Sequence, residues 1–315
     1  MKSIMVRRVT VSIALTTALA GVAACNSSDS SGGSGKGDKA GHKSAARVSP
    51  IAALRSAERS TDGADSARIE STTTLGTLMS MKSGGVMAWG DGFTGNMKIT
   101  YTGGSMAEAM RKMGSDSMEA RYLSDAYYAK MGDAFAQQAG GKHWIRYGYD
   151  DLAEFGGGSG ALLKDQMQNS SPNQSVKLLL ASGDVKKVGE ETVRGRRTTH
   201  YAGTVDVSDL AARSSHLTAS QLADMKKQFT TAGITTEDVD IWVDAKDLLV
   251  KAVSEAAMAS GTMSSTTYYS DYGVKVSAEA PPAGDTEDFK DLLSKQGVTP
   301  GSGDTATGSS TGSAS

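Results

Sequence analysis

The sequence has one cysteine, Cys25, among its 315 residues, so no disulfide can form within the chain. Stability must therefore come from burial and hydrogen bonding. Basic residues are also too few to dominate, because the formal net charge is −2. A nucleic-acid binder would show a basic patch or stripe, so nucleic acid is not an expected partner. No pair of histidines has the spacing of metal ligands, so no metal is expected, with a triad or zinc site built from residues distant in sequence as the alternative; the four are His42, His143, His200 and His216. No cofactor is expected either.

After its first 25 residues the sequence also lacks an apolar run long enough to cross a bilayer as a helix, which takes about 20 residues. The first 25 residues form a leader, which has an apolar run over residues 9–19 after the basic residues Lys2, Arg7 and Arg8, as in a signal peptide. Small residues at 22–24 come directly before Cys25. This order resembles a bacterial lipobox, which implies cleavage before Cys25 and lipidation of Cys25. The alternative is a chance cysteine in a plain secretory signal.

Composition divides the chain into four parts. We expect a lipoprotein signal peptide over residues 1–24 and a disordered tether over 25–46. One domain is expected over 47–296, followed by a disordered tail over 297–315. The tether and the tail are rich in Gly, Ser and Thr or Lys, and they have too few large apolar residues to offset the entropy of ordering. The part between them is long enough for one large domain or two small ones.

Alternating apolar and polar residues predict about ten strands, among them residues 67–74, 97–101, 239–243 and 262–269, with 274–278 as the last. Ser49-Pro50 predicts the start of a helix that ends near Gly63. Further helices are expected over 106–113, 161–168, 172–182, 218–231 and 285–295. Short turns join the strands, so the strands must be antiparallel. A long antiparallel sheet curls, and helices can fill its concave side. The predicted fold class is α+β, mainly antiparallel β: a half-open curved barrel with helices over the concave side.

Three blocks in this pattern resemble a known family: residues 195–206 (GRRTTHYAGTVD), 239–244 (VDIWVD), and 268–273 (YYSDYG) leading to Pro281-Pro282. Together with the lipobox and the tether they are similar to actinobacterial lipoproteins of the LppX/LprAFG type, which have a LolA-like fold. The resemblance spans roughly residues 49–295. It implies an apolar cavity that binds or carries acylated lipids or glycolipids. The family has no short pocket motif, so the resemblance assigns no pocket residue.

No motif in the sequence predicts an enzyme. Residues 90–95 match G-x-G-x-x-G, but a strand rather than a helix is expected after them, which indicates a hairpin turn. Ser105 and Ser159 lie in glycine-rich stretches but do not complete G-x-S-x-G. Asp238, Asp240 and Asp244 share one face of a predicted strand, as in a cation site or a solvated polar face. Trp242 shares that face, which suggests a sheet that is apolar on both faces in places.

Methionines crowd the first half of the folded part, at positions 79, 81, 87, 97, 106, 110, 113, 118 and 131. Flexible, polarisable methionine side chains suit a surface that adapts to varied apolar ligands, although ordinary core packing explains them as well. The candidate ligand-binding residues are Met79, Met81, Trp89, Trp144 and Leu179.

The sequence therefore predicts a lipoprotein anchored through Cys25 to the extracytoplasmic face of the cell membrane. We expect it to bind, and to carry, an acylated lipid or glycolipid in an apolar cavity without catalysis. Residues 161–168, hinged at 156–158, are the expected lid. The alternative is an envelope sensor or interaction module that binds a protein partner through the same fold. An exposed apolar patch without an internal cavity would favour this alternative.

Overall fold

A computed structural model describes residues 49–152, 171–206, 223, 227 and 229–295. The chain divides into two units, residues 1–46 and 47–315, and every described residue belongs to the second. The expected signal peptide, lipobox, tether and C-terminal tail lie outside the described residues. So do the expected lid helix at 161–168 and most of the expected helix at 218–231.

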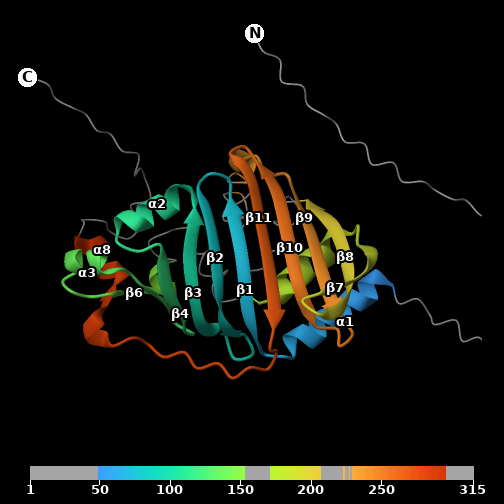
Figure 1. Cartoon of the computed structure of the whole chain (residues 1–315), viewed down its shortest axis with the longest axis horizontal. Helices are drawn as coiled ribbons and strands as arrows, with labels where there is room; N and C mark the ends of the chain where they lie inside the picture. Colours follow the sequence, from blue (N-terminus) through green and yellow to red (C-terminus); the bar gives the residue numbers. More distant parts are fainter. Residues whose placement is uncertain (1–48, 153–170, 207–222, 224–226, 228, 296–315) are drawn as a thin grey trace, which may run out of the picture. The chain divides into compact units, whose positions relative to one another are not determined.

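Twelve strands form one sheet in the order β12-β6-β5-β4-β3-β2-β1-β11-β10-β9-β8-β7 (Figure 1). Every neighbouring pair is antiparallel except β12 and β6, which are parallel. The strands are β1 (Ser66–Leu75), β2 (Met79–Ala88), β3 (Thr94–Gly103), β4 (Ser117–Tyr122), β5 (Ala126–Lys130), β6 (Trp144–Gly148), β7 (Lys186–Val193), β8 (Arg196–Asp206), β9 (Thr236–Asp244), β10 (Leu249–Met258), β11 (Gly261–Ser270) and β12 (Thr286–Asp288).

The helices that pack on this sheet have local signals at their ends. Ser49 caps the first helix by accepting a hydrogen bond from the amide of Ala52, and Pro50 fits the first helical position. Gly183 ends another helix in the left-handed conformation, at φ 71°. The helices are α1 (Pro50–Asp62), α2 (Gly104–Lys112), α3 (Asp133–Gln138), α5 (Asn173–Ser182), α8 (Phe289–Lys295) and a 3-10 turn, η1 (Ala283–Asp285).

The main core lies between α1, α5 and one face of β8 to β11, which we term the inner face. Val239 and Ile241 alternate along β9 and are almost fully buried in this core. Leu54 of α1 and Leu179 of α5 cover them and have no exposed surface. Burying one such side chain contributes about 1.5–3 kcal/mol, so this region stabilises the domain strongly.

The opposite, outer face carries two smaller apolar clusters around tryptophans. Trp242 packs with Val193 and Val250, and the Lys251 ammonium lies 3.8 Å from the centre of its ring. Trp144 packs with Ala126 and Tyr128 and is 4% exposed. The expectation that the sheet is apolar on both faces in places is confirmed at both sites.

The predicted fold class is confirmed: the sheet is mainly antiparallel and open, and α1 and α5 cover its inner face at β8 to β11. The predicted helix over 49–63 and most hairpins are confirmed. Residues 90–95 lie at the turn between β2 and β3, so the G-x-G-x-x-G string belongs to a hairpin.

The prediction of a final strand at 274–278 is wrong. Both sides of β11 are already occupied, by β10 and β1, so no ladder is open to the segment that follows. Residues 273–282 instead cross the ends of the strands toward β12 (Figure 1). Side chains hold this segment: Ser66 Oγ donates to the Val274 carbonyl at 2.7 Å, and Asn96 Nδ2 donates to the Ser277 carbonyl at 2.8 Å.

The predicted helix over 285–295 begins later than expected, at Phe289. Residues 286–288 form the short strand β12 on β6. A three-residue strand shows no periodicity, and its partner lies about 140 residues earlier, so the sequence pattern carried no signal for it.

Candidate functional site

The inner face of β1 to β6 carries many methionine, tyrosine and aliphatic side chains. Cross-strand register places them together, since directly opposed residues point to the same side of a sheet. Met81 pairs with Tyr101, and Leu75 pairs with both Met79 and Met263. These side chains are half-buried; the set is Ile69, Leu75, Met79, Met81, Met97, Ile99, Tyr101, Met118, Tyr122, Tyr127 and Tyr147.

Five of the aromatic rings at one end of this face form a ladder across the strands. It runs from Phe93, at the β2–β3 turn, through Tyr122, Tyr127 and Tyr147 to Phe289 at the start of α8. Successive ring centroids lie 5.5, 5.3, 5.2 and 4.8 Å apart. Such spacings are those of attractive aromatic pairs, so the ladder is a preformed apolar wall.

The tyrosine hydroxyls of this wall are held in the neutral form. Burial raises the pKa of Tyr122 to about 12, and the neighbouring Tyr101 adds to this effect. Burial also raises the pKa of Tyr127, with smaller contributions from Tyr122 and Tyr147. Raised pKa values caused by desolvation indicate a site of low dielectric constant. The site therefore offers apolar surface together with a few neutral hydroxyl groups.

The structure brings together only some of the residues predicted for ligand binding. Met79 and Met81 lie on the inner face of β2 beside the tyrosines. Leu179 is fully buried in the α5 core. Trp89 donates from Nε1 to the Asp62 carbonyl at 3.2 Å, at the end of α1. Trp144 lies on the outer face, where the Arg121 guanidinium is 4.6 Å from its ring centre.

The tyrosines were missed among the predicted residues. Their signal was present in the sequence, because Tyr101, Tyr122, Tyr127 and Tyr147 each occupy the same alternation phase as the apolar residues of their strand. Which phase faced the inner side depended on strand pairing, and only the structure shows that.

The acidic residues of β9 each have a separate partner. Asp238 accepts a hydrogen bond from Thr204 at 2.7 Å, and Asp240 lies 2.5 Å from His200 Nε2. Asp244 accepts from the amides of Lys246 and Leu248 in the β9–β10 turn. No group of metal-binding side chains occurs among the described residues. The geometry of these three carboxylates fits a polar sheet face and a turn.

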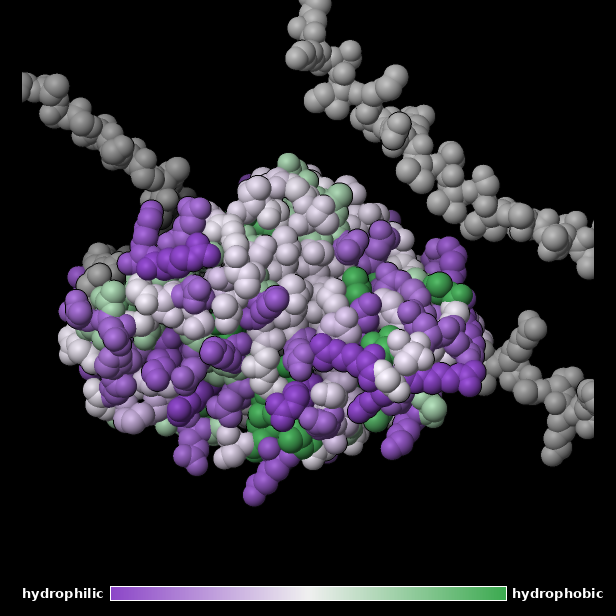
Figure 2. Space-filling model, viewed as in Figure 1, coloured by the Kyte–Doolittle hydropathy of each residue, from purple (hydrophilic) through white to green (hydrophobic). Residues whose placement is uncertain are grey.

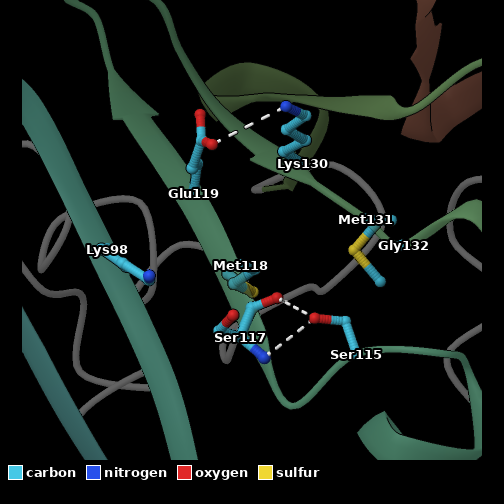
Figure 3. A pocket seen from close by; sticks show the side chains of 8 residues that line it. All are labelled: Lys98, Ser115, Ser117, Met118, Glu119, Lys130, Met131 and Gly132. Carbon is cyan, nitrogen blue, oxygen red and sulfur yellow. Dashed lines mark hydrogen bonds and ion pairs between the residues drawn. The ribbon is translucent and has the colours of Figure 1, made fainter.

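A small polar pocket opens on the outer face between β3, β4 and β5 (Figure 3). Its volume is about 210 Å³. Glu119 pairs with Lys130 across it at 3.7 Å, and Ser115 Oγ is bound to both the amide and the carbonyl of Ser117. Its charged lining differs from the apolar cavity that the resemblance implies; it is lined by Lys98, Ser115, Ser117, Met118, Glu119, Lys130, Met131 and Gly132.

Comparison with known proteins shows which family the chain belongs to. No protein-family model matches it. A Streptomyces griseus protein, described as an uncharacterised 31.2 kDa protein in the rplA–rplJ intergenic region, is 56% identical over 81% of this chain and 84% of its own length. A Streptomyces coelicolor protein described as a candidate lipoprotein is 48% identical over 92% of this chain and 98% of its own. The chain belongs to this Streptomyces family.

Solved structures similar to this chain include two mycobacterial proteins of the group that the sequence resembles. LppX of Mycobacterium tuberculosis is 14% identical, with 73% of this chain and 98% of LppX covered and a TM-score of 0.46. LprF of Mycobacterium bovis is 15% identical, with coverages of 74% and 97% and a TM-score of 0.45. None of the helices in the described residues is both long and apolar enough to cross a membrane.

Proposed function

We propose that this protein is an envelope lipoprotein that binds one acylated lipid or glycolipid on the inner face of β1 to β6. The main observation behind this proposal is the wall of half-buried Met and Tyr side chains on the inner face, opposite the charged outer face. In this proposal Cys25 carries the lipid anchor and holds the protein on the extracytoplasmic face of the cell membrane. The candidate lipoprotein among its relatives supports the anchor.

Binding in this proposal is non-covalent. Apolar contact supplies the affinity, at roughly 25 cal/mol per Å² of apolar surface removed from water, before the cost of ordering the ligand. Methionine side chains adapt to acyl chains of different shape. The neutral tyrosine hydroxyls give hydrogen bonds to ester or sugar oxygens without the cost of burying a charge. These groups hold and orient a ligand, and the proposal includes no catalytic step.

Native mass spectrometry of the Cys25→Ser chain, which cannot receive the anchor, tests this proposal after purification from an actinobacterial host without detergent. We expect an acylated species bound at near-stoichiometric amount, with its identity given by lipid mass spectrometry of an apolar extract. A clean unliganded mass would contradict the proposal and favour an interaction module that binds a protein partner.

A pair of matched variants tests the location of the ligand. Met81→Gln with Ile99→Gln places two polar groups on the inner face of β2 and β3. Lys82→Gln with Thr100→Gln changes two directly paired residues on the outer face of the same strands. We expect the inner-face pair to lower the bound fraction about tenfold, since each buried amide costs about 1–3 kcal/mol, and the outer-face pair to leave it unchanged. Equal loss in both would refute the assignment to the inner face.

A further inference from the structure

One end of the central strands carries no charged residue in any of three segments that meet there. No Asp, Glu, Lys or Arg occurs at 71–81, 99–107 or 256–270. These segments include the β1–β2 turn, the start of α2 and the β10–β11 turn. About a quarter of the residues of a typical domain are charged, so three adjoining segments without a charge form an unusual surface.

Hydrogen bonds join the three segments into one surface, which we term the uncharged rim (residues 75–81, 103–107 and 256–263). The Gly76 amide donates to the Thr262 carbonyl at 2.9 Å. The Met106 amide donates to the Leu78 carbonyl at 3.0 Å. The rim forms the upper end of the sheet in Figure 1, and Figure 2 shows pale, weakly polar surface there, with hydrophilic residues gathered over neighbouring α2.

Two large apolar side chains project from the rim into solvent. Leu78 is 48% exposed and Met106 is 38% exposed, and their backbones are hydrogen-bonded to each other. Exposed apolar side chains placed side by side in an uncharged setting mark a contact surface rather than ordinary solvent-facing structure.

A pair of basic residues borders the rim. Arg111 and Lys112 lie exposed in the last turn of α2, and neither forms an ion pair with a described residue. Glu108, one turn earlier, leaves α2 with a net charge of +1. Two cations with no ion-pair partner in the described part of the chain, beside an apolar tip, complement a surface that is negatively charged outside and apolar inside, which is the arrangement of an anionic bilayer.

We propose that the uncharged rim docks on an anionic lipid membrane. Leu78 and Met106 enter the boundary between head groups and acyl chains, while Arg111 and Lys112 lie at the phosphates. A protein partner fits the rim less well, because protein interfaces are enriched in aromatic residues and arginine, and the rim contains neither.

The rim also adjoins the proposed ligand site. Leu75, Met79 and Met263 lie on the inner face at this end of the sheet, in line with Met81 and Tyr101. An acyl chain that leaves the membrane at the rim therefore reaches the inner face without crossing a charged stretch. This route rests on the proposed function, whereas docking of the rim does not.

Fluorophore labelling tests the docking directly. The mature chain from residue 25 with Cys25→Ser has no acyl group and no other cysteine. Leu78→Cys then receives an environment-sensitive fluorophore, and Val188→Cys on β7, 58% exposed, is the matched control. With phosphatidylglycerol-containing vesicles we expect a blue shift at position 78 and none at 188. No shift at 78, or equal shifts at both positions, overturns the proposal.

Vesicle flotation of the same unlabelled Cys25→Ser chain measures how much Arg111 and Lys112 contribute to membrane binding. Arg111→Gln with Lys112→Gln should lower partitioning about tenfold, and pure phosphatidylcholine vesicles should bind the parent chain weakly. Lys186→Gln with Lys187→Gln on β7 is the matched control and should change little. Binding to native membranes that is lost on protease treatment of those membranes, without binding to lipid vesicles, would identify a protein partner and overturn the proposal. A cargo found by native mass spectrometry in a chain that does not bind vesicles would retain the ligand site and reject only the rim.

Discussion

The hydroxyl of Tyr272 donates a 2.6 Å hydrogen bond to the carbonyl oxygen of Leu249. Leu249 begins β10 at an irregularity in its pairing with β9, and it is fully buried. Its amide donates to Thr61 Oγ1 at 3.2 Å. Side chains from α1 and from the segment just after β11 thus satisfy both backbone groups of a buried residue where the ladder is irregular.

Thr61→Val should therefore destabilise the fold without changing side-chain volume. The buried Leu249 amide loses its acceptor, and we expect the free energy of unfolding to fall by about 1–3 kcal/mol. Thr61→Ser keeps the hydroxyl and is the control. Urea denaturation followed by circular dichroism measures both variants, and equal midpoints for the parent and Thr61→Val would contradict the role of this hydrogen bond.

The tyrosine ladder predicts a loss of stability at alkaline pH. Folding raises the pKa of Tyr122 and Tyr127 above the ordinary value of 10.0. Their contribution is fully present below about pH 10 and is lost as the pH rises toward the folded-state pKa, because only the unfolded chain releases these protons. Each such tyrosine adds a slope of about 1.4 kcal/mol per pH unit in this range.

Tyr127→Phe should remove the contribution of one ionising hydroxyl to this dependence of stability on pH. We expect the free energy of unfolding in urea to fall less between about pH 9 and about pH 11 in the variant than in the parent. The two falls should differ by about 1.4 kcal/mol, which is the contribution of one tyrosine over one pH unit above 10. Equal falls would mean that Tyr127 ionises alike in the folded and unfolded chains.

Glu287 predicts local opening of the C-terminal segment at acid pH. Hydrogen bonds from Lys142 and then Lys295, both at 2.5 Å, lower the pKa of Glu287 below 4.5. The stabilisation is present above about pH 4.5 and is lost as the pH falls through the lower folded-state pKa. Glu287→Gln should weaken the attachment of β12 and α8 by about 2 kcal/mol at neutral pH.

Hydrogen exchange of the amides of β12 and α8 measures this effect. Faster exchange is expected there in Glu287→Gln, with the central strands unaffected. Glu119→Gln is the control, because the Glu119–Lys130 pair is exposed and contributes at most about 1 kcal/mol. Similar exchange in both variants would show that the Glu287 pair is no stronger than a surface pair.

Variants of Trp144 distinguish a role in stability from a role in ligand binding. It is 4% exposed on the outer face, so Trp144→Ala should lower the free energy of unfolding by about 3–5 kcal/mol. The milder Trp144→Phe keeps the fold and is expected to retain full cargo in native mass spectrometry. Loss of cargo in Trp144→Phe, with stability maintained, would place the ligand against the outer face instead.

Much of this architecture was predictable from local pattern. Alternation along residues 67–74 and 239–243 defines strands and their two faces, and Ser49-Pro50 defines the start of α1, because each signal depends on neighbouring residues alone. Methionine composition singled out Met79 and Met81, which both lie on the inner face of β2, and their part in ligand binding stays a prediction.

The faces of Trp144 and of the tyrosines were not predictable in this way. Alternation shows that two faces exist, but pairing decides which of them meets α5. β1 pairs with β11 across about 200 residues of sequence, and this contact joins the two halves of the sheet and gives both a common inner side.

The sequence by itself determined the leader and lipobox pattern, the two polar tails, the position of most strands and the absence of charge at 71–81, 99–107 and 256–270, since all of these are properties of contiguous residues. Only the tertiary structure decided that the three uncharged segments meet at one rim, that residues 273–282 cross the strands instead of joining them, and that Tyr122, Tyr127 and Tyr147 form one wall. Each depends on contacts between strands remote in sequence, and those contacts form where backbone hydrogen bonds and apolar burial are satisfied together across the whole sheet.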